Sequence, residues 1–514
     1  MTTLHRDSPP AAHDVLAALP ELIEHAMAVS ATPGLNIAIA HRGELVYEDA
    51  FGHADLAAGT PMRTDTLTQS GSITKLYTAV ALMQLVEQGR ADVYAPVNRY
   101  LPDFQLVNPL GERDITIYDL LTFRSGLATD TNYAQLYAPR PLRDFLADEL
   151  RATSQPGYDH HLARWCAKVG ERWEYSNLGL AIAGHLVELL NEDGLSFGEY
   201  VEARILAPLG MRSSLAPAAQ DAAHVPPEVL DRRSTGYALF GRTYVPAPLV
   251  QSPLTPAVGL LTTPGDHLRL LMALLGGGTH DGARILAPET VRFMLSPHVT
   301  VGTDQLDCRH NGVTFELGKW GTRIAHFGRT GVHTFGWLNL GRGYPHLDLA
   351  ICVFTNRWDI RRWYNPDATM APGAIAGFVA ERLAADGDGA LPVRATRTRA
   401  WKTSYAIGLT VVERLAGLLE LDAETIPATV AAMAAGAREQ AGAGEWDPDG
   451  FAQGVADMLR VPMAPQSIRG VVASDHLAIS PEDLRLVWLG FSGRAQVPMP
   501  VGHWADAEHV ARPV

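Results

Sequence analysis

The chain has 514 residues, of which 47% are hydrophobic and 19% are charged, which is enough apolar material for a large core and for more than one ordinary domain. The net charge of −14 argues against nucleic acid or an anionic membrane as a partner. No apolar run reaches the roughly 18 residues of a membrane span. Met1–Pro10 lacks the apolar core of a signal peptide, which predicts a cytoplasmic protein.

The first 69 residues are predicted to contain one helix and a pair of strands between less regular segments. Residues 1–15 are predicted to be disordered, and a helix rich in Leu and Ala follows. Leu35–Ala40 has the alternation of a strand, and a hairpin at His41–Gly43 leads into a second strand, Leu45–Phe51. Residues 52–69 are predicted to be loop.

The middle of the chain, from about 72 to 290, is mainly helical in pattern, with Pro/Gly-rich loops at 101–112 and 216–260. Strand-like segments then return at 323–328, 335–341 and 348–355. A helix at about 372–385 closes the region. Strands at both ends with helices between them predict one sheet built from distant segments and covered by helices.

The last part of the chain is predicted to be a separate unit. The domain boundaries we expect are 16–385, a linker at 386–399 that begins with Asp386–Pro392, and an α-rich extension at 400–514. The extension has no recognisable catalytic residues, so we interpret it as a packing or homo-oligomerisation element.

The three cysteines, Cys166, Cys308 and Cys352, are odd in number and widely spaced, which implies neither a disulfide framework nor a zinc site. The 19 histidines include no His-Glu-x-x-His motif, and the adjacent pair His160 and His161 cannot both face one ion from a helix. We therefore predict no metal and no cofactor.

Lysine is scarce, because only four of the 42 basic residues are Lys and the rest are Arg. One of the four, Lys75, stands three residues after Ser72, at the start of an apolar helical pattern. Residues i and i+3 share a helix face. A desolvated Lys can act as a neutral base, which Arg cannot. The pair therefore predicts a serine nucleophile with an adjacent base, beside N–H groups at a helix N-terminus.

Two further segments supply polar groups of the kind that such a nucleophile needs. Tyr175 and Asn177 lie two apart ahead of a helical pattern, and a phenol beside a cationic Lys has its ionised form favoured, so Tyr175 could shuttle a proton. The other segment, Ile324–Gly331, combines His326 and Arg329 with glycines at a predicted strand end, where a backbone N–H could face an oxyanion.

At these residues the chain resembles the family of class C β-lactamases, penicillin-binding proteins and the related serine esterases, D-aminopeptidases and transacylases. The family signature is Ser-x-x-Lys, then Tyr-x-Asn, then Lys-Thr-Gly or His-x-Gly. The resemblance covers about 20–385. It includes three weaker segments, Ile115–Leu127, Pro208–Met211 and Gly259–Asp266. It implies a β-lactamase-like α/β sandwich, in which an antiparallel sheet is flanked by helices and a helical lobe faces the active-site cleft.

The resemblance also implies roles for individual residues. Ser72 would be the nucleophile, Lys75 its base partner, Tyr175 the proton shuttle and Asn177 a donor to the substrate. The third motif departs from the pattern and leaves two alternatives, which involve four residues: His326, Arg329, Gly331 and Val332. In the one we favour, Arg329-Thr330-Gly331 replaces Lys-Thr-Gly, the guanidinium faces the cleft, and the Val332 N–H completes the oxyanion hole with that of Ser72. In the other, His326 begins His-x-Gly and the Arg329 N–H is the second donor.

The function that follows is acyl transfer through an ester on Ser72, with an ester or amide of a small molecule or peptide-like metabolite as substrate. Water would be the acceptor in an esterase or amidase, and an amine or alcohol in a biosynthetic transacylase. The rivals are a non-catalytic binding protein of the same fold and a metal-dependent hydrolase. The missing signal segment disfavours a secreted β-lactamase or cell-wall peptidase.

Overall fold

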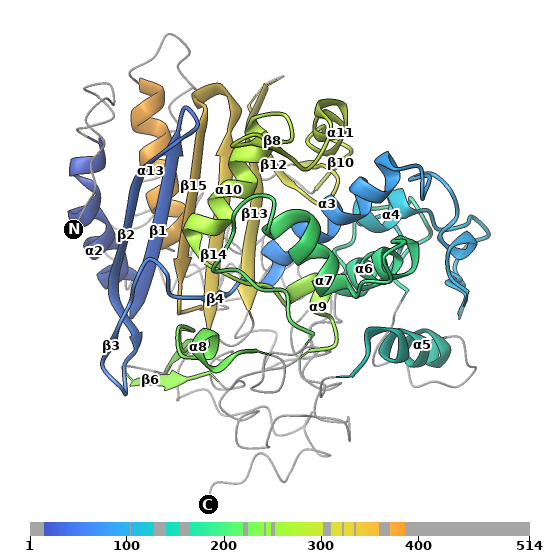
Figure 1. Ribbon diagram of the computed structural model, residues 1–514, viewed down its shortest axis with the longest axis horizontal. Helices are drawn as coiled ribbons and strands as arrows, with labels where there is room; N and C mark the ends of the chain where they lie inside the picture. The colour runs from blue at the N-terminus through green and yellow to red at the C-terminus, as the bar shows by residue number, and fades with distance from the viewer. Residues whose placement is uncertain are drawn as a thin grey trace, which may run out of the picture.

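A large antiparallel sheet is the centre of the molecule (Figure 1). The computed structural model describes residues 15–102, 104–127, 140–153, 165–218, 225–240, 243–247, 252–301, 310–320, 323–333, 336–358 and 371–385. The predictions for residues 1–14, for the linker at 386–399 and for the extension at 400–514 lie outside this range.

Nine strands of the described residues form the sheet, in the order β10-β11-β12-β13-β14-β15-β1-β2-β3, and every neighbouring pair is antiparallel. Their bounds are β1 Gly34–His41, β2 Glu44–Asp55, β3 Thr60–Pro61, β10 Val299–Thr300, β11 His310–Asn311, β12 Glu316–Trp320, β13 Arg323–His333, β14 Trp337–Tyr344 and β15 Leu349–Thr355. Strands from the two ends of the described part of the chain therefore lie side by side inside the sheet, where β1 pairs with β15.

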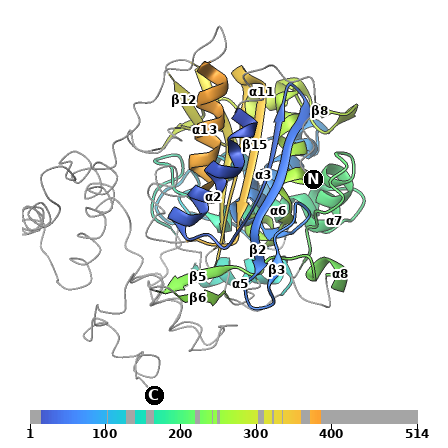
Figure 2. The same cartoon turned by 90° about the vertical axis from the view of Figure 1, so that its left-hand side faces the viewer.

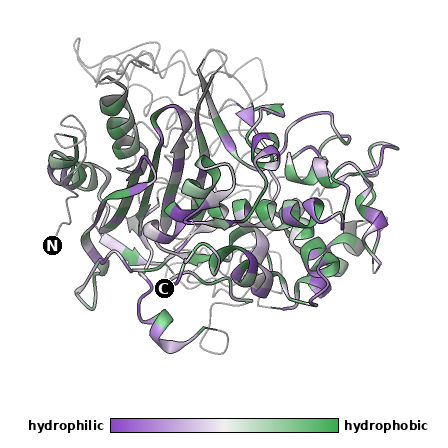
Figure 3. Cartoon of the chain, turned by 45° about the horizontal axis from the view of Figure 1, so that its top comes forward, coloured by the Kyte–Doolittle hydropathy of each residue, from purple (hydrophilic) through white to green (hydrophobic). Residues whose placement is uncertain are grey.

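Helices cover both faces of the sheet (Figure 2). One face packs against α2 (Leu19–Ser30) and α13 (Ala371–Ala385) through a smaller cluster of buried apolar side chains. The other face packs against α10 (Pro264–Leu275), beyond which lie α3 (Thr74–Glu87), α6 (Asn177–Leu190) and α9 (Thr255–Val258), through the larger cluster. Hydrophobic residues gather along the strands and the inner helices in Figure 3.

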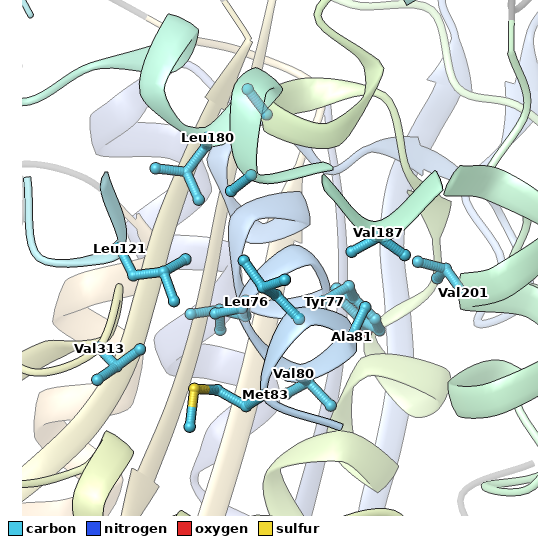
Figure 4. Packing of buried hydrophobic residues seen from close by; sticks show 14 of the residues in the cluster. Leu76, Tyr77, Val80, Ala81, Met83, Leu121, Leu180, Val187, Val201 and Val313 are labelled. Atoms are coloured by element: carbon cyan, nitrogen blue, oxygen red, sulfur yellow. The ribbon is translucent and has the colours of Figure 1, made fainter. Parts of the chain in front are cut away.

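Helix α3 lies inside the larger cluster and is buried on all sides, from Thr74 through Leu85. Figure 4 shows its side chains, among them Leu76 and Val80, packed against those of neighbouring segments such as Leu180 and Val187 of α6. The first turn of α3 is consequently buried along with the rest of the helix.

The remaining elements are short and connect or flank these layers. They are α4 Ile117–Leu121, α5 Leu142–Thr153, α7 Phe197–Val201, α8 Pro227–Leu230, α11 Pro288–Met294, β4 Thr68–Gln69, β5 Tyr237–Phe240, β6 Thr243–Pro246, β7 Leu261–Thr262, β8 Thr279–His280 and β9 Ala283–Arg284, with the single turns η1 Gly71–Ile73, η2 Val97–Arg99, η5 Glu202–Leu206 and η6 Pro345–Leu347. Within the described ranges, no helix combines the length and hydropathy that crossing a bilayer requires.

The structure confirms the hairpin of β1 and β2, the helical middle region, the returning strands and the closing helix, and with them an antiparallel sheet flanked by helices. Four predicted boundaries are wrong. The predicted loop at 216–260 contains α8, β5, β6 and α9. Val15 is helical and buried rather than disordered. The predicted loop at 52–69 contains β3 and β4. The predicted strand at 323–328 continues to His333. Its glycines, Gly328 and Gly331, do not end the strand; each lies where the backbone of another segment approaches it closely.

Candidate active site

Ser72 lies in η1, the single turn that leads into α3. Gly71, the residue before it, has a φ of +56°. A Cβ at Gly71 would lie 2.5 Å from the carbonyl oxygen of Val332, so this position requires glycine for both its φ and its space. The turn that carries Ser72 is therefore pressed against β13.

Lys75 follows on the first turn of α3 and is completely buried. Its Nζ lies 3.0 Å from Ser72 Oγ and donates a hydrogen bond of 2.9 Å to the carbonyl oxygen of Ala257 in α9. Burial lowers the pKa of Lys75 to about 8; the Tyr175 phenol opposes this shift and the Arg329 cation adds to it. A substantial fraction of the amine is therefore neutral near neutral pH.

Tyr175 reaches the same serine from the loop before α6. Ser176 caps that helix by accepting a hydrogen bond from the Gly179 N–H. The Tyr175 hydroxyl lies 2.5 Å from Ser72 Oγ, and the Lys75 Nζ lies 5.0 Å from the ring centroid. Burial by itself raises the pKa of Tyr175, but the Lys75 and Arg329 cations, with hydrogen bonds from Lys75 and Ser72, outweigh it and lower the pKa.

The third motif lies within β13, and Arg329 is the member that the structure brings to this cluster. Its Cζ is 5.2 Å from the ring centroid of Tyr175 and 5.3 Å from that of Phe123, and its Nη1 donates to the carbonyl oxygen of Thr314 at 2.5 Å. Arg329 is 3% exposed, so its guanidinium is enclosed by protein rather than open to a cleft as the sequence led us to expect.

Gly331 and Val332 continue the strand past the nucleophile. A Cβ at Gly331 would lie 2.0 Å from the Ser70 carbonyl oxygen, so this strand position and η1 are in direct contact. Asn177 is the first residue of α6 and is buried two positions after Tyr175. Gly331, Val332 and Asn177 therefore all belong to segments that surround Ser72.

His326 is placed elsewhere. It is three residues before Arg329 on the same strand, and successive strand residues point to opposite faces, so the two side chains leave β13 on different sides. The His326 ring lies 5.7 Å from that of Tyr344, a member of the smaller cluster under α2 and α13. Of the two alternatives for the third motif, this geometry favours Arg329.

Several groups around the cluster have no signature in the sequence. The Ala257 and Thr314 carbonyls hold the two cations, and backbone acceptors of this kind depend on tertiary structure alone. Phe123 is almost fully buried with its ring 5.1 Å from that of Tyr175, and it has a φ of +58°, a strained value for a bulky residue. It lies in Ile115–Leu127, one of the three weaker segments of the family resemblance, and this was the one sign of its importance in the sequence.

Cys166 and Cys352 are free thiols away from this cluster, and burial raises the pKa of both, that of Cys166 to about 11. Cys308, His160 and His161 lie outside the described residues. The described part of the chain contains no group of three His, Cys, Asp or Glu side chains that could hold a metal ion.

Comparison with known proteins agrees with this architecture. The model of the beta-lactamase family matches residues 19–368. Esterase EstB of Burkholderia gladioli is 34% identical over 212 residues, 39% of this chain and 51% of that protein, and penicillin-binding protein 4 of Amycolatopsis lactamdurans is 31% identical over 277 residues, 51% and 65% respectively. An uncharacterized protein of Mycobacterium tuberculosis is 28% identical over 330 residues, 58% of this chain and 78% of that protein.

Solved structures show the same fold. The octameric penicillin-binding protein homologue from Pyrococcus abyssi matches with a TM-score of 0.58 and 24% identity, covering 72% of this chain and 76% of that one. The D-amino acid amidase from Ochrobactrum anthropi SV3 matches with a TM-score of 0.57 and 21% identity, covering 72% and 97%. Because the family model spans most of the chain and the antiparallel sheet with its covering helices agrees with it, the chain belongs to the beta-lactamase family.

Proposed function

We propose that this protein is a serine acyl-enzyme hydrolase that acts on an ester or amide of a small molecule or peptide-like metabolite. One observation carries the proposal: Ser72 Oγ lies 3.0 Å from the buried Lys75 amine and 2.5 Å from the Tyr175 hydroxyl. A nucleophile within hydrogen-bond reach of a base, with a second proton carrier on the same oxygen, is the arrangement that acyl transfer needs.

The reaction begins with neutral Lys75. Ser72 Oγ attacks the substrate carbonyl carbon while its proton passes to the Lys75 amine. The tetrahedral intermediate then expels the alcohol or amine, which takes its proton from the Tyr175 hydroxyl, and Tyr175 recovers a proton from Lys75. The acyl group remains as an ester on Ser72. Water attacks this ester in the second half, and the same groups move its proton so that the acid and the free serine are released.

Two backbone N–H groups are available to the oxyanion, those of Ser72 and Val332. The Thr330 N–H donates to Glu316 of β12 at 2.9 Å, so it points away from β14. N–H groups two residues apart on a strand point to the same side, and the Val332 N–H therefore also points away from β14. The pairing of β12 with β13 extends along β13 only as far as Gly328, which pairs with Glu316. Val332 lies four residues beyond it, where β13 is next to Gly71 instead of β12. These contacts support an oxyanion hole between η1 and β13.

The proposal is tested by covalent labelling. A fluorophosphonate probe should add one adduct to the wild-type protein, at Ser72, and Ser72→Ala should abolish both the adduct and ester turnover. Ser70→Ala is the matched control, because Ser70 is a buried serine two residues away whose hydroxyl is paired with that of Thr74 at 3.0 Å. It should keep both. An undiminished adduct in folded Ser72→Ala would refute the assignment of the nucleophile.

A further inference from the structure

Four residues in one row of the sheet face the segment that leads to the nucleophile. Gly331 of β13 pairs with Asn339 of β14, Asn339 pairs with Phe354 of β15, and Phe354 pairs with Asn36 of β1. Directly opposed residues of antiparallel strands point to the same face. Phe354 belongs to the larger cluster, so the whole row faces the side of the sheet that holds Ser72.

Both asparagines of the row are fully buried and bind the backbone of the crossing segment. Asn36 Nδ2 donates to the carbonyl oxygens of Arg63 and Thr66, at 3.2 and 3.0 Å. Asn339 Nδ2 donates to the Gln69 carbonyl oxygen at 2.7 Å. In Figure 1 this segment, which contains β4, passes across the lower part of the sheet on its way to α3. Along the chain, Asn36 thus fixes the start of the segment over β1, and Asn339 fixes its end over β14.

The last of these contacts lies directly before the proposed oxyanion hole. Ser70 follows Gln69, and its carbonyl oxygen occupies the space that a Cβ on Gly331 would need. Pairing of β4 with β7 fixes the other edge of the segment, through Gln69 and Leu261. Asn339 therefore links the segment that carries the Ser72 N–H to the sheet that carries the Val332 N–H.

We propose that Asn339 is a positioning residue that sets the separation of the two oxyanion donors, a role that rests on the proposed function of Ser72 and Val332. Asn36 makes the same kind of hydrogen bond from the same face, but to residues six or more positions before Ser72. All of β4 lies between Thr66 and Ser72, whereas only Ser70 and Gly71 separate Gln69 from Ser72, so a shift near Thr66 should be weakened before it reaches Ser72. Asn36 should stabilise the fold without affecting the chemistry.

The experiment compares Asn339→Leu with Asn36→Leu, each a change of a fully buried amide to an apolar side chain of similar size. Both variants should lose thermal stability, because each leaves a buried backbone carbonyl without its donor. Asn339→Leu should lower kcat by about 30- to 100-fold with KM within about twofold, the effect expected of a small displacement at an oxyanion hole. Asn36→Leu should keep kcat within about twofold of wild type.

A second readout separates positioning from general loosening. A thionoester substrate places a larger sulfur, which is a weaker hydrogen-bond acceptor, in the oxyanion hole, so a well-formed hole favours the ester over its thionoester. This preference should shrink in Asn339→Leu and stay unchanged in Asn36→Leu. If Asn339→Leu does not fold, Asn339→Ala serves instead, with Asn36→Ala as its control, because alanine removes the donor to Gln69 and adds neither bulk nor an acidic proton.

Two outcomes would overturn the inference: equal loss of kcat in the asparagine variants at positions 36 and 339, or an unchanged ester preference in a folded variant at position 339. Failure of the proposed function is seen separately, in the wild-type protein, as absence of ester turnover and of a fluorophosphonate adduct at Ser72.

Discussion

The pH dependence of turnover follows from the burial of Lys75. If the neutral amine is the base, kcat/KM should rise with pH up to about 8, because Lys75 releases its proton as the pH passes its lowered pKa, and should fall at higher pH once Tyr175 loses the proton that the leaving group needs. Below that pKa the slope of log kcat/KM against pH should approach one. Since Lys75 and Tyr175 are in contact, the value measured belongs to the pair.

The size of the effect can be worked from the pKa. An ordinary Lys has a pKa of 10.5, and at pH 7.5 only about one molecule in a thousand holds it neutral. With a pKa of about 8, roughly a quarter of the molecules hold Lys75 neutral at the same pH, a gain of about 250-fold in available base. Lowering the pH to 6 should reduce kcat/KM by roughly 25-fold relative to pH 7.5.

Lys75→Arg separates base from charge. Arg keeps a positive charge in this position but cannot accept the serine proton, so its loss of kcat/KM should be close to that of Lys75→Ala. The assay is steady-state hydrolysis of one ester from pH 5.5 to 9, with the folded fraction of each variant checked by circular dichroism. A flat profile for wild type across pH 6–8, or activity of Lys75→Arg within about tenfold of wild type, would refute the role of Lys75 as a base.

Three further predictions concern the surroundings of the cluster. Arg329→Ala should lower kcat more than it raises KM, because the enclosed guanidinium lies against Tyr175 and lowers the pKa of its phenol. His326→Ala should leave kcat/KM within about threefold of wild type. If steady-state kinetics show both variants near wild type, neither side chain of β13 belongs to the site. Phe123→Ala should lower kcat by about tenfold by loosening Tyr175, and urea unfolding should show a loss of about 3 kcal/mol from the cavity left by the ring. When a primary amine is added to the ester assay, chromatography should show the free acid as the main product; amide as the main product would indicate a transacylase.

The prediction for Arg329 illustrates what the sequence could not supply. From the motif alone its guanidinium was expected in an open cleft, where it would mainly affect substrate binding. Its enclosure depends on the Thr314 carbonyl and the Phe123 ring, which come from distant segments and have no fixed spacing to the motif. The structure thereby moves the expected effect of Arg329→Ala from KM to kcat.

The cluster of Ser72, Lys75 and Tyr175 could be predicted from the sequence because local rules place these residues. The i, i+3 spacing and the apolar helical pattern bring Lys75 to Ser72, and Tyr175 stands in a short motif before a capped helix. The alternation at Leu35–Ala40 and the strand-like segment at 348–355 likewise predicted strands at both ends of one sheet, which the structure has as β1 and β15. The short strands β3, β4 and β12 were missed, because two to five residues give too little alternation to be distinguished from loop.

The packing of α3 in the core also produces the lowered pKa on which the proposed chemistry of Lys75 depends. A shift of its pKa from 10.5 to about 8 means that the charged form is disfavoured by about 3 kcal/mol, which is a large part of the net stability of an ordinary domain. This cost comes from burial, and Lys75 is buried because the helix that carries it, α3, lies inside the larger cluster. A more polar environment would stabilise charged Lys75 and weaken it as a base. The burial that destabilises its charged form is therefore what fits Lys75 for the proposed reaction.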